Sequence, residues 1–105
     1  MNALLQLLMG PWTTQILWVL RTQGTMRFGV LQRSIGQISA RVLTQRLRLL
    51  EEGGIVYRDY RPTVPPEVSY GLTPRGHELG AVLDGLDTLA RRWAKEDTLR
   101  KHSSG

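Results

Sequence analysis

The sequence predicts a single, mainly α-helical domain that carries one small β-hairpin. Three observations predict this fold class. Apolar residues recur at helical spacing along most of the chain, two short segments alternate in the manner of strands, and a proline-rich loop joins those segments. A chain of 105 residues can form one domain with a modest core. We assign residues 1–100 to this domain and expect residues 101–105 to form a disordered tail.

Two helices are predicted at the N-terminus. Residues 2–9 form a short helix whose leucines Leu4, Leu5 and Leu8 face inward. A second helix is expected to begin at Pro11, because a first helical position needs no N–H, and to end near residues 22–24. Its apolar stripe consists of Trp12, Ile16, Val19 and Leu20. Leu17 and Trp18 lie off this stripe, so we expect the helix to be apolar on two sides and to be covered by another element, for which a partner chain is one candidate.

The centre of the chain predicts a helix-turn-helix. Residues 25–27 are expected to be extended, and a short helix over residues 28–34 is followed by a turn at Gly36 and Gln37. The next helix lies within Ile38–Gly53, with Ser39 as its N-cap and with Gly53 and Gly54 as its stop signal. Two short helices joined by a glycine-containing turn are typical of this DNA-binding motif.

The second of these helices has two distinct faces. The apolar stripe consists of Ala40, Leu43, Leu47 and Leu50, and the opposite face of Arg41, Thr44, Gln45 and Arg48. Arginine and glutamine hydrogen-bond base edges and phosphates, so we interpret residues 39–52 as a DNA recognition helix. Alternatively, the face is merely solvated and Arg48 pairs with Glu52. Arg46 lies about 100° from Gln45 towards the apolar flank, where intraprotein or DNA-backbone contacts are expected.

A predicted hairpin follows this helix directly. Residues 55–61 and 68–72 alternate as strands on either side of the loop RPTVPPE. A hairpin in this position is typical of the wing of a winged helix-turn-helix. Arg58 and Arg61 are expected to place cations near the sugar-phosphate backbone. The alternative is an exposed hairpin whose arginines protect a sheet edge from aggregation.

The last predicted helix begins with Thr73 as its cap and Pro74 at its first position, and runs to about Lys95. Its apolar stripe is longer than so small a domain can cover, which favours a homodimer built from the terminal helices. Alternatively, the helix folds back over its own core. The expected dimer interface consists of Leu4, Leu8, Trp18, Leu79, Leu83, Leu86, Ala90 and Trp93.

The net charge and the residue composition indicate which partners and which kinds of site to expect. A net charge of +5 favours an acidic polymer such as double-stranded DNA as partner. The absence of cysteine excludes disulfides and zinc–thiolate sites and is typical of a cytoplasmic protein. Gly10 and Pro11 interrupt the apolar N-terminus, so we expect no signal peptide and no membrane span.

No spacing in the sequence indicates catalysis, a cofactor or a metal. We therefore expect no enzyme activity. The three tryptophans, Trp12, Trp18 and Trp93, are candidate walls of a pocket for an unidentified small-molecule effector. The alternative for such large apolar rings is that they belong to the core.

Four stretches together resemble a known family: GPWTTQILWVL, RFGVLQRSI, ISARVLTQRLRLLEEGGIV and YRPTVPPEVSYGLTPRG. The chain resembles the HxlR-type regulators, bacterial winged-helix transcription factors allied to the MarR superfamily, over roughly residues 5–95. The resemblance implies a homodimeric DNA-binding repressor or activator that reads DNA with residues 39–52. Two departures stand out. Many relatives carry a cysteine near the N-terminus, and they often have a basic residue where this chain has Glu67.

The sequence thus leads to two hypotheses. The first is a sequence-specific regulator that binds an inverted-repeat operator as a homodimer, with residues 39–52 in the major groove and residues 55–72 as the wing. The second is a winged helix retained as a protein-interaction or dimerisation module without specific DNA binding. Release of counterions from DNA phosphates would give the first a steep salt dependence, which the second would lack.

Overall fold

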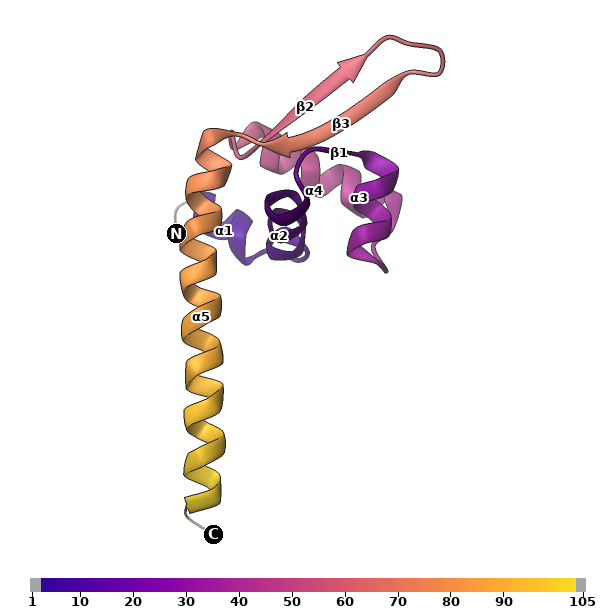
Figure 1. Ribbon diagram of the computed structural model, residues 1–105. Coiled ribbons are helices and arrows are strands. Elements are labelled where there is room, and N and C mark those ends of the chain that lie inside the picture. Colours follow the sequence, from indigo (N-terminus) through magenta and orange to yellow (C-terminus); the bar gives the residue numbers. More distant parts are fainter. Residues whose placement is uncertain (1–2, 104–105) are drawn as a thin grey trace.

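The computed structural model describes residues 3–103, which form five helices and three short strands (Figure 1). The elements are α1 (Ala3–Met9), α2 (Thr13–Gln23), β1 (Met26–Arg27), α3 (Phe28–Ile35), α4 (Ala40–Glu52), β2 (Val56–Arg61), β3 (Glu67–Leu72) and α5 (Pro74–Ser103). The predicted mainly α-helical fold with a β-hairpin is confirmed, and the hairpin follows the helix pair α3–α4 as expected of a winged helix-turn-helix.

One hydrophobic core joins α2, α3, α4 and the sheet. Its buried members come from every one of these elements, so the core fixes the rotation of each helix about its axis. The buried apolar residues are Ile16, Leu17, Val19, Leu20, Leu31, Ile38, Leu43, Leu47, Leu50, Ile55, Val56, Tyr70 and Leu72. Ala40 differs from the prediction, because this first residue of α4 is exposed.

The sheet has the strand order β1–β3–β2 and is antiparallel throughout. The predicted hairpin forms with Val56 opposite Leu72 and Arg61 opposite Glu67. The segment that was expected to be merely extended, Met26–Arg27, adds a third strand by pairing with β3. This pairing holds the start of α3 beside the middle of β3, and the hairpin rises above the helices in Figure 1.

The start of α2 also differs from the prediction. The helix begins at Thr13 rather than at Pro11, because Trp12 adopts a left-handed conformation with a φ of 69°. A non-glycine residue with this backbone angle interrupts a right-handed helix. Thr13 is completely buried, and its hydroxyl donates a hydrogen bond of 2.8 Å to the carbonyl oxygen of Leu7. The sharp turn between α1 and α2 is thereby fixed by side-chain contacts.

Helix α5 is longer than predicted. It continues past Lys95 to Ser103 and so includes residues 101–103 of the segment that was expected to be a tail. Thr73 caps its first turn by accepting from the amide of Gly76 at 3.1 Å, as expected. Arg21 ties this helix to α2 through an ion pair with Asp84 and a hydrogen bond to the carbonyl oxygen of Gly80.

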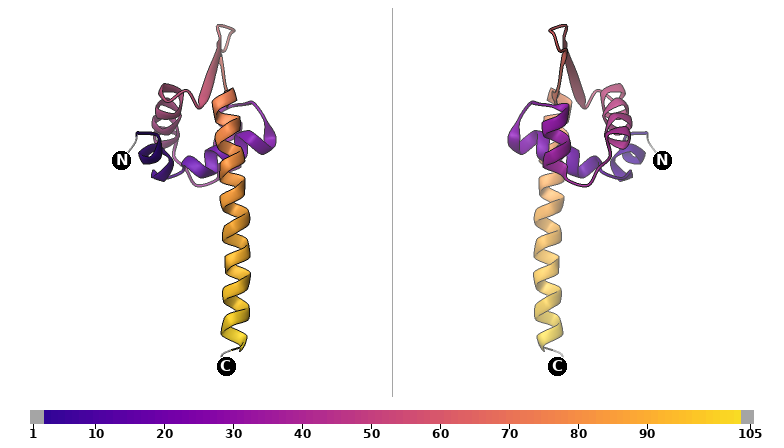
Figure 2. Two further views of the ribbon diagram at one scale, coloured as in Figure 1. Left: turned by 90° about the vertical axis from the view of Figure 1, so that its left-hand side faces the viewer. Right: turned by 90° about the vertical axis from the view of Figure 1, so that its right-hand side faces the viewer.

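Further along the chain, α5 projects away from the body, and residues 91–100 are all exposed (Figures 1 and 2). Within residues 3–103, no helix combines the length and the apolar character that crossing a membrane would require.

Candidate nucleic-acid interface

The outer face of α4 presents four polar side chains together, and we name Arg41, Thr44, Gln45 and Arg48 the recognition face. All four residues are exposed, whereas Leu43, Leu47 and Leu50 on the opposite side are buried. The Ser39 hydroxyl accepts from the amide of Val42 at 3.1 Å, which confirms the predicted cap. Since the core holds the apolar side, the recognition face has to point outward.

A shallow groove runs along this face towards α3. It is lined by Phe28, Ala40, Arg41, Thr44, Gln45 and Arg48. Thr44 donates to the carbonyl oxygen of Ala40 at 2.8 Å, and its hydroxyl oxygen can still accept a hydrogen bond. Within residues 3–103, neither Arg41 nor Arg48 forms an ion pair, and the alternative contact of Arg48 with Glu52 is not made. Both guanidinium groups are therefore available to acceptors from outside the chain.

Arg46 behaves differently from its neighbours on α4, as predicted. Its Nη2 atom donates to the Thr13 hydroxyl at 2.8 Å and to the carbonyl oxygen of Leu7 at 3.2 Å. The side chain points back into the protein rather than outward with the recognition face. The prediction of intraprotein contacts from Arg46 is confirmed.

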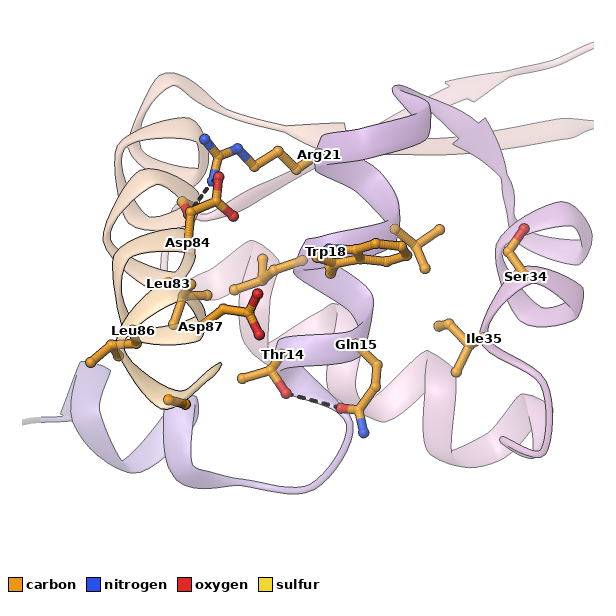
Figure 3. Close-up of a pocket in the computed structure, with 14 residues that line it drawn as sticks. Thr14, Gln15, Trp18, Arg21, Ser34, Ile35, Leu83, Asp84, Leu86 and Asp87 are labelled. Carbon is orange, nitrogen blue, oxygen red and sulfur yellow. Dashed lines mark hydrogen bonds and ion pairs between the residues drawn. The ribbon is translucent and has the colours of Figure 1, made fainter. Parts of the chain in front are cut away.

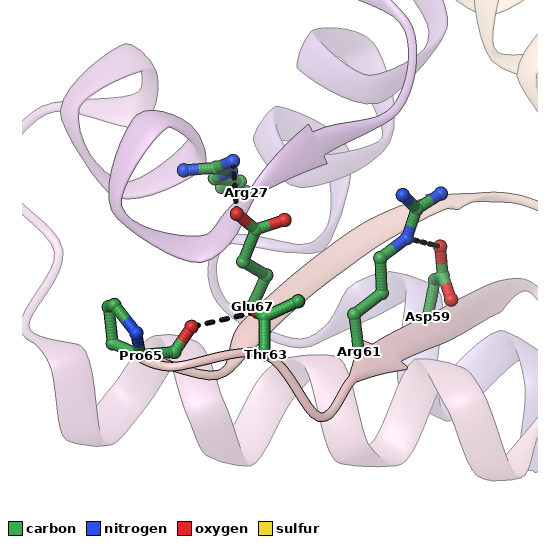
Figure 4. A network of polar contacts seen from close by, with 6 residues as sticks. All are labelled: Arg27, Asp59, Arg61, Thr63, Pro65 and Glu67. Carbon is green, nitrogen blue, oxygen red and sulfur yellow. Dashed lines mark hydrogen bonds and ion pairs between the residues drawn. The ribbon is translucent and has the colours of Figure 1, made fainter.

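The hairpin carries its two predicted cations on exposed positions. We name β2, residues 62–66 and β3 the wing. The guanidinium of Arg58 lies 5.5 Å from the ring centre of Tyr60, a cation–π contact that extends the side chain along the strand. Arg61 forms an ion pair of 3.5 Å with Asp59, and 68% of its side chain is exposed (Figure 4). An exposed pair of this kind is weak, so Arg61 remains free to exchange Asp59 for a phosphate.

Glu67, the residue that departs from the family pattern, has a partner that sequence reasoning missed. Its carboxylate accepts from Arg27 at 2.7 Å, and this ion pair joins the start of α3 to the wing (Figure 4). Arg27 directly precedes α3 and sits in β1, which pairs with β3. The only local indication of this contact was the predicted extended conformation of residues 25–27. The contact itself depends on the pairing of β1 with β3, which brings together residues far apart in the sequence.

The residues of the expected dimer interface fall into two groups. Leu8, Leu79 and Leu83 are partly buried against their own core. Trp18, Leu86, Ala90 and Trp93 are exposed. The side chain of Leu4 lies outside the described part of the structure. The alternative in which α5 folds back thus holds for the first turns of the helix, and the later turns present apolar groups to solvent.

The three tryptophans do not come together in one pocket. A cavity of about 640 Å³ lies between α2, α3 and α5, and its walls include Trp18, Ile35, Leu83 and Leu86 (Figure 3). Neither Trp12 nor Trp93 lines this cavity. Trp12 packs partly against the core, and Trp93 lies one helical turn beyond Ala90, the last residue of α5 at the cavity wall. Trp18 is therefore the one candidate wall residue that the cavity includes.

Across residues 3–103, no three His, Asp or Glu side chains are grouped so that they could hold a metal ion.

A helix-turn-helix with an outward-facing basic recognition face, followed directly by a wing, defines a winged-helix DNA-binding protein. Residues 7–98 match the HxlR-like helix-turn-helix family, which is 92 of the 105 residues. The chain belongs to this family, and it is a DNA-binding transcriptional regulator. This result favours the first hypothesis from the sequence over the protein-interaction module.

Several solved structures and curated protein sequences are similar to this chain. An HTH-type transcriptional regulator of Methanothermobacter thermautotrophicus is 36% identical over 96 residues, which span 91% of this chain and 70% of that protein. A crystal structure from Enterococcus faecalis V583, assigned to the MarR family of transcriptional regulators, has a TM-score of 0.82 at 37% identity and covers 90% and 84% of the two chains.

The reduced form of the transcriptional regulator YodB from Bacillus subtilis is also similar, with a TM-score of 0.75, 35% identity and coverage of 84% and 85%. YodB has additionally been crystallised after treatment with the thiol oxidant diamide. The present chain has no cysteine in its 105 residues, so no thiol oxidation within it can change its structure.

Proposed function

We propose that this chain acts as a homodimer that binds an inverted-repeat operator in double-stranded DNA. In this proposal α4 enters the major groove and the wing lies beside the sugar-phosphate backbone. The observation that carries the proposal is the recognition face, where two arginines without an ion-pair partner in the described chain flank a glutamine on an exposed, rigidly held helix.

The chemistry of these side chains suits base recognition. An arginine donates two hydrogen bonds to O6 and N7 of guanine, and a glutamine pairs with N6 and N7 of adenine. We assign these contacts to Arg41, Gln45 and Arg48, and assign Thr44 to a neighbouring base or phosphate. Ser39, at the N-terminus of α4, is placed near a phosphate, because free amides and the helix dipole favour anions there.

The dimer supplies the symmetry of the operator. Exposed apolar side chains on α5 continue past the body, with 57% of Leu86 and 56% of Trp93 accessible. A like-with-like contact between two copies closes most simply as a two-fold pair. Such a pair places its two recognition helices about 34–36 Å apart, one turn of duplex from centre to centre.

Single-base variants of an operator test the proposed contacts. The operator is first selected by the wild-type protein from random duplexes, and competitive binding is then measured for Arg41→Ala, Gln45→Ala and Arg48→Ala. Each variant is expected to lose about 1–3 kcal/mol of discrimination at one or two base pairs and to keep it elsewhere.

Arg92→Ala is the matched control, because it removes the same charge as Arg41→Ala from an exposed site on α5. It is expected to leave the base preferences unchanged. If the α4 variants weaken binding equally across all single-base variants, the recognition face supplies only charge. If they have no effect at all, α4 does not enter the groove.

A further inference from the structure

Arg46 connects the recognition helix to the turn between α1 and α2. Its Nη2 atom donates to the Thr13 hydroxyl at 2.8 Å and to the carbonyl oxygen of Leu7 at 3.2 Å. Among the described residues, Arg46 is the one side chain that joins α4 to another helix by hydrogen bonds, and it reaches both α1 and the start of α2. Arg46 therefore adds a polar, directional tie between α4 and the end of α1 to the apolar contacts that both helices make in the core.

The acceptors of Arg46 form a small network that belongs to the end of α1. The carbonyl oxygen of Leu7 lies in the last turn of that helix, where carbonyls have no partner within the helix. It accepts from Arg46, from the Thr13 hydroxyl at 2.8 Å and from the amide of Gly10 at 3.2 Å. Thr13 both donates and accepts, and its hydroxyl is buried in the structure, so the network holds a single geometry.

Gly10 provides the space for this contact. A side-chain carbon at Gly10 would collide with the guanidinium of Arg46, since even the Cζ atom would lie only 2.9 Å from it. The φ angle of Gly10 is not positive, so the requirement for glycine here concerns space rather than backbone conformation. Gly10→Ala therefore displaces the guanidinium while Arg46 itself is kept.

Packing alone does not account for an arginine at this position. The side chain is partly buried, and its Nε atom is buried without a hydrogen-bond partner in the described chain. A buried donor without a partner loses the hydrogen bond that it made with water, whereas an apolar side chain of similar length would avoid that loss. The guanidinium is thus better explained by the geometry that it imposes than by the stability that it adds.

We infer that Arg46 is a positioning residue that sets the spacing between the two half-sites of the operator. The inference rests on the proposed function. Helix α1 is one of the terminal helices of the proposed dimer, and α4 carries the recognition face. Leu5 of α1, which was expected to face inward, is 50% exposed and so adds to the apolar surface of this helix. Because Arg46 ties α4 to the end of α1, it fixes the distance and angle between the two recognition helices of the dimer. One added base pair shifts a half-site by about 3.4 Å and rotates it about the duplex, so a rigid tie selects one spacing.

The experiment selects duplexes from a pool in which two copies of the preferred half-site are separated by spacers of varied length. The wild-type dimer is expected to recover one spacer length. Arg46→Met removes both hydrogen bonds of the tie, and its preference for that spacer over one a base pair longer is expected to fall about tenfold, in keeping with the loss of hydrogen bonds to a charged group. Thr13→Val removes only the bond of 2.8 Å and leaves the one to the carbonyl oxygen of Leu7, so its preference is expected to fall in the same direction by a smaller factor. Their base preference within each half-site is expected to remain.

Two further variants separate the effect of the tie from the effect of losing a positive charge. Gly10→Ala is expected to broaden the spacer distribution like Arg46→Met, although it retains the charge. Arg92→Met loses the same charge on α5 and is expected to recover the wild-type spacer. Thermal melts identify which variants are folded. If Arg46→Met does not fold, the spacer preferences of Thr13→Val and Gly10→Ala test the role of Arg46 instead.

The two proposals fail in different ways. Folded Thr13→Val and Gly10→Ala variants that recover only the wild-type spacer would overturn the role of Arg46. A wild-type protein that selects no inverted repeat at all would overturn the proposed function instead.

Discussion

Glu67 is one of the two carboxylates of the wing, the other being Asp59. It pairs with Arg27 of the neighbouring strand β1 at a distance of 2.7 Å and so neutralises that cation. Both side chains are at least one-third exposed, so the pair contributes little to folding stability. Its larger effect is electrostatic, because a neutral or basic residue at position 67 would leave Arg27 free for a phosphate.

Glu67→Gln is therefore expected to tighten binding to all duplexes to a similar degree. The gain comes from one more available cation, so the salt dependence of the binding constant should steepen by about one counterion. Titrations at several salt concentrations measure both quantities. Glu96→Gln, which changes the net charge equally but lies on the projecting part of α5, is the control and is expected to have a smaller effect. An unchanged affinity for Glu67→Gln would mean that neither Arg27 nor the loop end of β3 approaches DNA.

Leu47 illustrates how the buried side of α4 supports its outer face. It is 1% exposed, whereas Leu49 on the same helix is 38% exposed. Leu47→Ala is expected to lower the free energy of unfolding by about 2–5 kcal/mol, and Leu49→Ala by much less. Urea denaturation at one fixed protein concentration provides the comparison. Equal losses for the two variants would contradict the orientation of α4 in the structure.

At the scale of elements, the predictable features are those encoded in neighbouring residues. The cap at Ser39, the leucine repeat and the polar outer face of α4 are all local, and the structure reproduces them. Contacts between distant segments were not predictable in this way. The pair of Arg27 with Glu67 and the third strand both depend on the register of β1 against β3.

Two further differences have local causes that the sequence does not reveal. Trp12 adopts a left-handed backbone angle that a tryptophan seldom adopts. The prediction that α2 begins at Pro11 was therefore wrong, and the helix begins at Thr13. The leucines of α5 continue along one stripe, and periodicity alone does not tell that Leu79 packs inward while Leu86 remains exposed. That distinction depends on where the body of the domain ends.

The wing as an element is expected to contribute affinity without sequence preference. Arg58→Ala and Arg61→Ala should each weaken binding to all duplexes alike and reduce the salt dependence by about one counterion. Asp59→Asn is the informative control, because it frees Arg61 from its ion pair and should not weaken binding. Binding is measured by competition between the selected operator and its single-base variants. A base-specific loss for either arginine would place the wing in a groove rather than at the backbone.

At the scale of the whole molecule, the shape is unusual for a chain of this length. The described structure extends 64 × 29 × 21 Å, and the radius of gyration is 16.8 Å, against about 13 Å for a compact chain of 100 residues. The projecting part of α5 accounts for this difference (Figure 2). Its apolar residues Val82, Leu86 and Trp93 lie along one stripe and remain exposed in a single copy.

Leu86→Glu is expected to convert the proposed dimer into monomers, because it places a charge in the centre of this stripe. Thr88→Glu introduces the same charge on the opposite side of α5 and should leave the assembly intact. Sedimentation equilibrium at micromolar concentration gives the mass of each species. A monomeric mass for the unmodified chain would contradict the dimer.

In the proposed dimer, the projecting helix would also make the amount of folded structure depend on how much protein is present. A helix with no tertiary contacts is only marginally stable in water, so we expect contacts with a second copy to keep the later turns of α5 ordered. Dilution below the dissociation constant of the proposed dimer should therefore reduce the circular dichroism signal at 222 nm while α2–α4 remain folded. Under this arrangement the occupancy of an operator would rise more steeply than in proportion to the abundance of the regulator, since assembly, the ordering of α5 and DNA binding would occur together.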